Sequence, residues 1–469
     1  MCYNKIFRIE INYMEREKFK SRLGFILISA GCAIGIGNVW RFPYVVGNNG
    51  GGCFVLFYIL FLVILGLPIL TMEFSVGRAS QQSISRAFKT LEKPGQHWHL
   101  HGYIGMAGNY ILMFFYTTVA GWMIKYFFDT AKGDFNNATT NQVKNHFSKM
   151  NAVPSEMIFW TTIVIVIGFV VCSLGLQNGV EKISKVMMIA LLVIMVVLAI
   201  NSIFLDGAGK GLYFYLVPDF KHIQKIGFVN VIVAAMNQAF FTLSIGMGSM
   251  TIFGSYLGKD HSLLGESINI IVLDTFVAIV SGLIIFPTCF AFGVEPDQGP
   301  SLIFVTLPNI FAKMTGGRIF GSCFFVFMAF AAFSTVIAVF ENIMSSCMDL
   351  WKWSRKKTSI INGIIIIAGS IPCVLGFNVL SGFHPLGGET NVMDLEDFMI
   401  SNLILPIGSL IYTLFCTSRY GWGWDNYLKE VNTGSGLKVS GKIRFYCKWI
   451  LPSITLIIIV NGLISTFAK

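Results

Sequence analysis

Long apolar segments alternate with short polar ones from about residue 22 to the end of the chain. Most apolar segments have about 18 to 30 residues, and a helix of roughly 20 apolar residues crosses a bilayer. The pattern predicts an all-α integral membrane protein with eleven transmembrane helices, at residues 22–47, 51–75, 102–128, 156–174, 180–203, 227–256, 265–292, 317–349, 358–380, 394–417 and 444–467. Residues 1–21 are expected to form a cytoplasmic N-terminal segment, and residues 22–469 a single membrane domain.

The composition also indicates a membrane protein. Of the 469 residues, 12% are charged and 54% are hydrophobic, whereas a soluble domain has roughly 25% charged residues. With a cytoplasmic N-terminus, the polar segments on the cytoplasmic side hold 23 of the 34 lysines and arginines. Such an excess orients a helical bundle, so the net charge of +10 indicates topology and no nucleic-acid partner. We expect a multi-pass protein of the plasma or inner cell membrane, surrounded by the lipid bilayer, with the C-terminus outside.

Residues 1–22 lack the apolar core of a secretory signal peptide, and Met14 is an alternative start. The ten cysteines are scattered without a CxxC pair, so we expect small buried side chains and neither a disulfide framework nor a metal site. All seven histidines lie in predicted loops or at their edges, which disfavours a membrane-embedded haem protein or other enzyme. The cluster "HWHLH" (His97 to His101) could bind a metal, but a cytoplasmic loop with chance histidines is the simpler interpretation.

Two apolar segments contain residues that weaken a helix at mid-membrane depth. "CAIGIGNV" (Cys32 to Val39) in the first segment is similar to "TLSIGMGS" (Thr242 to Ser249) in the sixth. Five spans separate the two, so they enter the bilayer from opposite sides, as in an inverted repeat of five plus five helices. We place repeat one at about 22–203, repeat two at about 227–417, and an extra helix at about 444–467.

A broken helix exposes N–H groups for an anion and carbonyls for a cation at one depth. Unpaired backbone groups are tolerated there only when protein buries them or when they line a wet cavity. The paired breaks therefore predict a binding site, although glycines also serve as close-packing residues between helices. A channel would need a continuous polar path, whereas these spans hold isolated polar residues at matched breaks. A sensor that binds without transporting is not distinguished by the sequence.

The motifs "GNVWRFPY" (Gly37 to Tyr44) and "NGGG" (Asn49 to Gly52), within Arg22 to Arg78, and the stretch Asn237 to Tyr256 resemble a known family. The chain is similar over its whole length to the bacterial branch of the neurotransmitter:sodium symporter family, in which an inverted repeat with broken helices 1 and 6 is already known. The resemblance implies a sodium-coupled symporter that takes up an amino acid by alternating access.

Two sodium sites are implied by matching the family's motifs position by position. The first consists of Ala33, Asn38, Thr242 and Asp274, and the second of Gly31, Ile34, Ala331, Ser334 and Thr335. All supply oxygen ligands, which hard cations prefer. Chloride-dependent relatives hold a halide near the positions of Tyr58, Gln238 and a serine where this chain has Ala278. We expect Asp274 to replace that halide and make transport chloride-independent, a protonated Asp274 that hydrogen-bonds within the bundle being the alternative.

The substrate site is implied in the same way. Gly35 stands where monoamine carriers have an aspartate, which favours a substrate with its own carboxylate. That carboxylate would meet the N–H groups of Ile36 and Gly37 and the Tyr116 hydroxyl. The apolar pocket, with an adaptable methionine, favours a hydrophobic or aromatic L-amino acid. The full predicted set is Cys32, Ala33, Ile36, Gly37, Leu112, Tyr116, Val119, Phe241, Thr242, Ser244, Met247 and Val339.

The resemblance also implies two gates, and at one position in span 5 this chain differs from the family's pattern. The outer gate would pair Arg41 with Asp397, with Asp394 as the competing partner. The inner gate would pair Arg16 with Asp349, supported by Tyr256 and Glu341, with Lys18 and Lys20 also available. Relatives often have a span 5 glycine and a proline with nine residues between them, at a weak point that admits water to the second sodium. Here Gly179 is followed by Ile189, which puts that release route in doubt.

Overall fold

Helices account for all regular structure in residues 17–294 and 302–467, which the computed structural model describes; these residues form no β-strand and only two isolated β-bridges. Repeat one and its connections comprise α1 (Arg22–Ala33), a π-helical turn η1 (Gly37–Arg41), α2 (Phe42–Asn48), α3 (Gly52–Phe61), η2 (Leu62–Gly66), α4 (Leu67–Ser80), α5 (Ile84–Leu91), α6 (Leu100–Lys132), α7 (Thr140–Ala152), α8 (Pro154–Ser173), η3 (Leu176–Glu181) and α9 (Lys182–Ile203).

The second half follows the same plan. Its elements are α10 (Ala208–Leu216), α11 (Phe220–Ile226), α12 (Phe228–Thr242), α13 (Ser249–Ser255), α14 (Leu263–Ala291), η4 (Leu302–Thr306), α15 (Leu307–Lys313), α16 (Gly317–Trp351), α17 (Arg355–Leu375), α18 (Val392–Phe398), η5 (Met399–Ile404), α19 (Leu405–Thr417), α20 (Trp424–Val431), η6 (Gly441–Ile443), η7 (Tyr446–Ile450) and α21 (Leu451–Phe467). Every predicted apolar segment is therefore helical or a pair of helices.

When helices are counted by length and apolar composition, the described residues give fewer than the eleven predicted spans. Nine helices of the described residues are long and apolar enough to cross a membrane, and ten if α1 and the η1–α2 unit form one span bent by 54°. The predicted segment 227–256 is missing from this count because it is divided into α12 and α13, each too short to cross alone. The difference thus comes from the break that the sequence predicts there.

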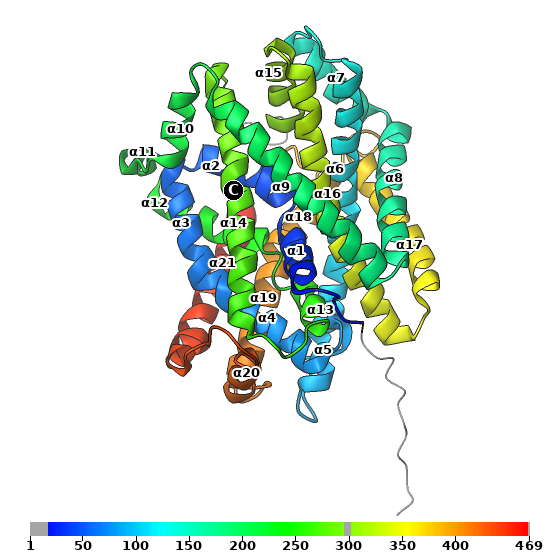
Figure 1. Ribbon diagram of the computed structural model, residues 1–469, viewed down its shortest axis with the longest axis vertical. Helices are drawn as coiled ribbons and strands as arrows, with labels where there is room; N and C mark the ends of the chain where they lie inside the picture. Colours follow the sequence, from blue (N-terminus) through cyan, green and yellow to red (C-terminus); the bar gives the residue numbers. More distant parts are fainter. Residues whose placement is uncertain (1–16, 295–301, 468–469) are drawn as a thin grey trace, which may run out of the picture.

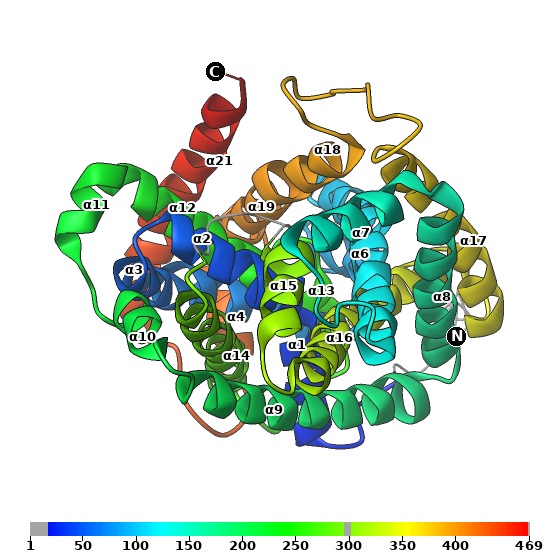
Figure 2. The same cartoon turned by 90° about the horizontal axis from the view of Figure 1, so that it is seen from above.

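The broken helices lie at the centre of the bundle. Seen from above, α1 and α13 are near the middle, flanked by α6 and α16, whereas α21 stands at the edge (Figure 2). The side view shows α1 and α13 beside each other, above the short helix α5 (Figure 1). α6 and α16 are also the most buried of the long helices. Backbone breaks in α1 and between α12 and α13 are therefore enclosed by protein, as their unpaired polar groups require.

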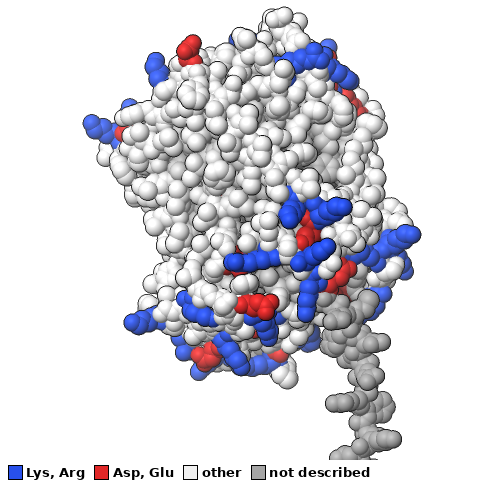
Figure 3. All heavy atoms as spheres, in the orientation of Figure 1, with Lys and Arg blue, Asp and Glu red and all other residues white. Residues whose placement is uncertain are grey.

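Charged side chains gather at the two ends of the molecule. On the face seen in Figure 3, most lie toward the end that carries α5 and α20, fewer lie at the opposite end, and a largely uncharged zone separates them. Many large apolar side chains of α8, α9, α17 and α21 are exposed, including Val166, Val193, Ile364 and Ile457. An apolar zone between two polar ends is the surface expected of a protein that crosses a bilayer.

Candidate functional site

The predicted second sodium site lies where α1 ends against α16. Ser334 Oγ donates to the carbonyls of Ile34 (3.0 Å) and Ala331 (2.8 Å). Thr335 Oγ1 lies 3.3 Å from the Gly31 carbonyl and 3.4 Å from that of Ile34. All five predicted residues are thus brought together from two helices that are 300 residues apart in sequence. Three carbonyl and two hydroxyl oxygens are a donor set that suits a hard monovalent cation such as sodium.

The predicted first sodium site surrounds the buried carboxylate of Asp274 on α14. Asn38 Nδ2 donates to Asp274 Oδ1 (2.8 Å), and Thr242 Oγ1 donates to Asp274 Oδ2 (3.2 Å). The Tyr58 hydroxyl lies 3.5 Å from the same oxygen. Ala33, the fourth predicted ligand, is the last residue of α1. A carboxylate that is fully enclosed by polar groups from several helices can supply a charge to a cation there, so the residues fit the ion.

Tyr58, Gln238 and Ala278, which match the positions around the halide of chloride-dependent relatives, also lie on the helices around the Asp274 carboxylate. The Tyr58 hydroxyl approaches Thr242 Oγ1 (3.4 Å), and Gln238 Nε2 donates to the Gly37 carbonyl (3.2 Å). The buried Gln238 Oε1 has no hydrogen-bond partner among the described residues. Ala278 is buried one helical turn beyond Asp274 and offers no hydroxyl. The only acidic side chain at this place in the described chain is that of Asp274.

A small cavity of about 20 Å³ lies between the two breaks. It is lined by Cys32, Ala33, Gly35, Gly37, Leu112, Tyr116, Phe241, Ser244, Met247, Thr335, Ile400 and Leu405. Eight of the twelve predicted substrate residues are in this set. Ile36 and Val119 line a larger cavity above it, Thr242 faces Asp274, and Val339 is fully buried and lines neither of these two cavities among the described residues. Gly35, Thr335, Ile400 and Leu405 were not in the predicted substrate set.

Gly35 is confined by the groups that surround the small cavity. A Cβ at this position would lie 2.2 Å from the Tyr116 hydroxyl and 2.5 Å from Thr335 Oγ1. The same hydroxyl accepts a hydrogen bond from the Ile36 N–H (2.9 Å). Only glycine therefore allows the broken helix, Tyr116 and the second cation site to meet at this point.

The break in span 6 is held by a residue that the sequence did not single out. Residues Leu243–Gly248 separate α12 from α13, with positive φ at Ser244 (49°), Gly246 (102°) and Gly248 (82°). The fully buried Glu73 of α4 accepts the N–H groups of Gly246 (2.8 Å) and Met250 (3.0 Å). A lone carboxylate inside the apolar run "LPILTMEFSV" was the available signal, because such a charge needs a partner.

At the predicted outer gate, Arg41 and Asp397 line a cavity of about 250 Å³ together with Phe241. The predicted direct ion pair is replaced by a bridge in the described residues: Arg41 Nη1 donates to Ser401 Oγ (3.3 Å), which donates to Asp397 Oδ1 (2.8 Å). The Arg41 guanidinium also lies 4.0 Å from the centre of the Phe241 ring. Asp394, the competing partner, caps α18 through Asn391 instead.

At the predicted inner gate, Arg16 lies outside the described residues, and Asp349 accepts the Ser83 N–H (2.8 Å). The Tyr256 hydroxyl donates to Glu341 (2.7 Å). Lys18 and Lys20 line a cavity next to Tyr256.

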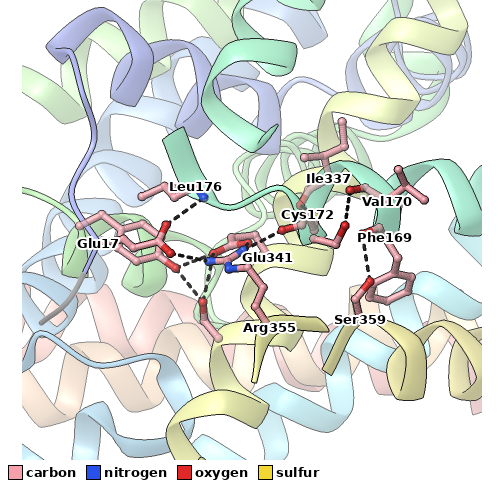
Figure 4. A network of polar contacts seen from close by, with 12 residues as sticks. Glu17, Phe169, Val170, Cys172, Leu176, Ile337, Glu341, Arg355 and Ser359 are labelled. Atoms are coloured by element: carbon pink, nitrogen blue, oxygen red, sulfur yellow. Dashed lines mark hydrogen bonds and ion pairs between the residues drawn. The ribbon is translucent and has the colours of Figure 1, made fainter. Parts of the chain in front are cut away.

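Glu341 has a further partner that sequence reasoning missed. Arg355 Nη1 lies 2.8 Å from Glu341 Oε2, and its Nη2 lies 3.5 Å from Glu17 Oε1. Figure 4 shows Glu341 and Arg355 pointing toward one another, with Glu17 beside them. Glu17 also accepts the Leu176 N–H (2.8 Å) at the start of span 5. The network therefore ties the segment before α1 to α16, α17 and η3.

Span 5 departs from a regular helix near Gly179 and not near Ile189. Gly179 lies in the π-helical turn η3, and a Cβ there would lie 2.1 Å from the Val171 carbonyl. Ile189 lies within the regular helix α9, and its side chain is exposed. Met188, one residue earlier, packs against Gly31 at the second cation site. The missing proline thus leaves α9 unbroken where it covers that site.

The histidine cluster forms part of a polar loop contact. Glu92 accepts hydrogen bonds from Lys89 (2.9 Å) and from the backbone and ring of His99 (3.1 and 2.7 Å). Burial alone would raise the pKa of Glu92, but these hydrogen bonds outweigh it and lower the pKa below its ordinary value. The described residues contain no group of three His, Cys, Asp or Glu side chains that could hold a metal ion.

Comparisons with known proteins agree with this arrangement. A model described as "Sodium:neurotransmitter symporter family" matches residues 16–155 and 130–469. The sodium-dependent transporter YhdH of Bacillus subtilis is 34% identical over 96% of this chain and 98% of its own length. The sodium- and chloride-dependent GABA transporter 2 of Rattus norvegicus is 23% identical over 96% of this chain and 81% of its own. A crystal structure of MhsT in complex with L-phenylalanine superposes with a TM-score of 0.86, at 37% identity, over 95% of this chain and 100% of MhsT.

Proposed function

Because the chain belongs to the sodium:neurotransmitter symporter family, we propose that it is a sodium-coupled symporter that takes up a hydrophobic or aromatic L-amino acid by alternating access. The similarity to MhsT, whose crystal structure holds L-phenylalanine, supports an amino-acid substrate. The proposed place is the plasma or inner cell membrane, with the N-terminus in the cytoplasm. The proposed stoichiometry of sites is two sodium ions and one amino acid.

One observation carries the proposal: two sets of oxygen donors and an apolar cavity meet at the two helix breaks. The donors of the second set lie at the end of α1 beside Thr335, which also lines the cavity. Thr242, next to cavity-lining Phe241, reaches the Asp274 carboxylate of the first set. Ions and substrate bound this close together would stabilise the same closed arrangement of helices, which is the physical basis of coupling.

The substrate carboxylate is proposed to lie between the first sodium and the Tyr116 hydroxyl. That hydroxyl accepts the Ile36 N–H at the break, where helix dipoles favour negative charge. The side chain of the substrate would enter the space among Leu112, Phe241 and Met247. The cavity of about 20 Å³ would have to widen to admit it. The Phe241 ring, which lies against the Arg41 guanidinium, lines both this cavity and the larger one.

Chloride independence is proposed to follow from Asp274. Its carboxylate occupies the neighbourhood of Tyr58 and Gln238, where chloride-dependent relatives hold a halide, and it supplies the negative charge itself. In the Asp274→Asn variant this charge is lost. Adding Ala278→Ser restores a hydroxyl for a halide, so the double variant should require chloride.

The test is uptake into liposomes that contain the purified protein. Labelled L-phenylalanine and a mixture of other L-amino acids are offered with an inward sodium gradient, and with potassium in place of sodium. We expect accumulation only with sodium, unchanged when gluconate replaces chloride, and chloride-dependent in the Asp274→Asn, Ala278→Ser variant. Binding without accumulation would favour a sensor, and loss of uptake in gluconate would refute the role of Asp274.

A further inference from the structure

A buried asparagine on α6 joins the scaffold of the bundle to the break in span 6. Asn109 is 1% exposed, and its Nδ2 donates to the carbonyls of Gly105 (2.6 Å) and Met247 (2.9 Å). Gly105 belongs to the same helix, whereas Met247 belongs to the segment Leu243–Gly248 that separates α12 from α13. The second hydrogen bond therefore crosses from a long, regular helix to irregular backbone.

The carbonyl end of the same amide is also engaged. Asn109 Oδ1 accepts from Asn342 Nδ2 on α16 (3.0 Å) and lies 3.5 Å from Ser249 Oγ at the start of α13. A side-chain amide has two donor hydrogens and two acceptor positions, and all four are used here. The orientation of Asn109 is consequently determined by three elements besides its own helix turn: α13, α16 and the Leu243–Gly248 segment.

Met247 is the residue of this segment that both lines the substrate cavity and is held by Asn109. Its neighbours Gly246 and Gly248 have φ values of 102° and 82°, so the peptide lies between two residues in conformations that favour glycine. α6 approaches Met247 closely: a Cβ at Gly105 would lie 3.2 Å from its carbonyl oxygen, and one at Gly108 would lie 3.4 Å from its sulfur. The glycines give access to Met247, and Asn109 supplies the directional contact.

We propose that Asn109 is a specificity-determining residue, which fixes the depth of the substrate pocket by holding the Met247 carbonyl against α6. This inference rests on the proposed function, since it assumes that the cavity next to Met247 receives the amino-acid side chain. Without the hydrogen bond, the two flanking glycines allow the Met247 peptide to withdraw from the cavity. Larger side chains should then bind better relative to smaller ones.

The experiment compares sodium-dependent binding of L-leucine, L-phenylalanine and L-tryptophan by competition. Asn109→Leu keeps the volume but loses the donor, and Asn109→Asp keeps the shape but presents oxygens to the Met247 carbonyl. Both should raise the affinity for tryptophan relative to leucine by about fivefold to tenfold, the effect of one lost hydrogen bond. Asn342→Ala, which removes one contact to Asn109, should change the ratio in the same direction by a smaller factor.

Asn362→Leu is the matched control. Asn362 is equally buried, and its Nδ2 donates to the Thr358 carbonyl (2.8 Å) on α17, but it lines neither cavity of the site. Its loss should leave the tryptophan to leucine ratio unchanged. Hydrogen exchange of Leu243–Gly248 provides a readout that needs no substrate: the Asn109 variants should speed exchange there, and Asn362→Leu should not.

Each outcome has a separate meaning. Retained binding with a tryptophan to leucine ratio within twofold of the wild type in both Asn109 variants would overturn the inference and leave the proposed function standing. Unchanged exchange of Leu243–Gly248 would overturn the claim that Asn109 holds Met247. If the wild type binds no amino acid in the presence of sodium, both the proposed function and the specificity role fall.

Discussion

The contact between Arg355 and Glu341 offers the sharpest test of what holds the segment before α1 against the bundle. Glu341 is fully buried and accepts hydrogen bonds from Tyr256 (2.7 Å), Arg355 (2.8 and 3.0 Å) and Ser345 (3.3 Å). Arg355→Ala removes the only cation that the described residues place on this carboxylate. The variant thus leaves a buried charge that two neutral hydroxyls cannot compensate.

The magnitude follows from burial. Removing one partner of a buried ion pair costs about 3–5 kcal/mol. Arg355 is 16% exposed on its side chain and also contacts Glu17, so the lower end of the range, about 3 kcal/mol, is appropriate. This cost falls on the state in which the segment before α1 is docked, because water can reach Glu341 once that segment detaches. Since 1.4 kcal/mol is a factor of ten, opening should become about 100-fold more favourable.

Hydrogen exchange of the N-terminal segment measures this opening directly. Residues Lys18–Phe25 and Leu176–Glu181 should exchange about 100-fold faster in Arg355→Ala. In the double variant with Glu341→Gln no charge is left buried, so more than half of the effect on a logarithmic scale should disappear. Arg318→Ala is the control: Arg355 Nη1 also donates to the Cys172 carbonyl (2.9 Å), and Arg318 likewise donates to a backbone carbonyl, that of Ala131, but at the other end of α16. A double variant that exchanges as fast as the single one would refute the reasoning.

Three further predictions concern single positions. Gly35→Ala should cost about 1–3 kcal/mol of stability and reduce sodium-dependent binding at least tenfold, because its Cβ would displace the Tyr116 hydroxyl and Thr335; thermal unfolding and competition binding measure both, and unimpaired binding would contradict it. Ser244→Gly should raise stability by about 1 kcal/mol in chemical unfolding, since the native φ of 49° strains any residue with a Cβ; a loss would disprove that strain. For Glu92, whose pKa is lowered on folding, the stabilisation is present above its unfolded pKa and is lost as pH falls through the folded pKa. At pH 7 the free energy of unfolding of the wild type should therefore exceed that of Glu92→Gln by about 1 kcal/mol in chemical unfolding. A difference in this free energy that persists below about pH 3 would contradict the lowered pKa.

The helix breaks and the polar side chains buried next to them are the parts of this protein that the sequence predicts well. Gly35 and Gly37, and again Gly246 and Gly248, forecast irregular backbone because glycines weaken a helix in the residues where they stand, whereas Gly31 lies in the regular helix α1. Polar side chains inside apolar spans, such as Asn38 and Asp274, forecast burial against partners for the same local reason. The structure brings these residues together at mid-bundle.

The partners themselves were decided by tertiary structure. Glu73 meets Gly246, 173 residues away, and Arg355 meets Glu341 from the next helix. The lone carboxylate of Glu73 indicates that it needs a partner but not which one, and nothing in the sequence pattern singles out Arg355. Ser401 lies between Arg41 and Asp397, and Ile400 lines the small cavity, because the π-helical turn η5 sets which face of span 10 points inward. Sequence patterns fix where a helix starts, breaks and meets lipid. Which side chains touch depends on how helices rotate and cross, and that is determined by the packing of the whole bundle.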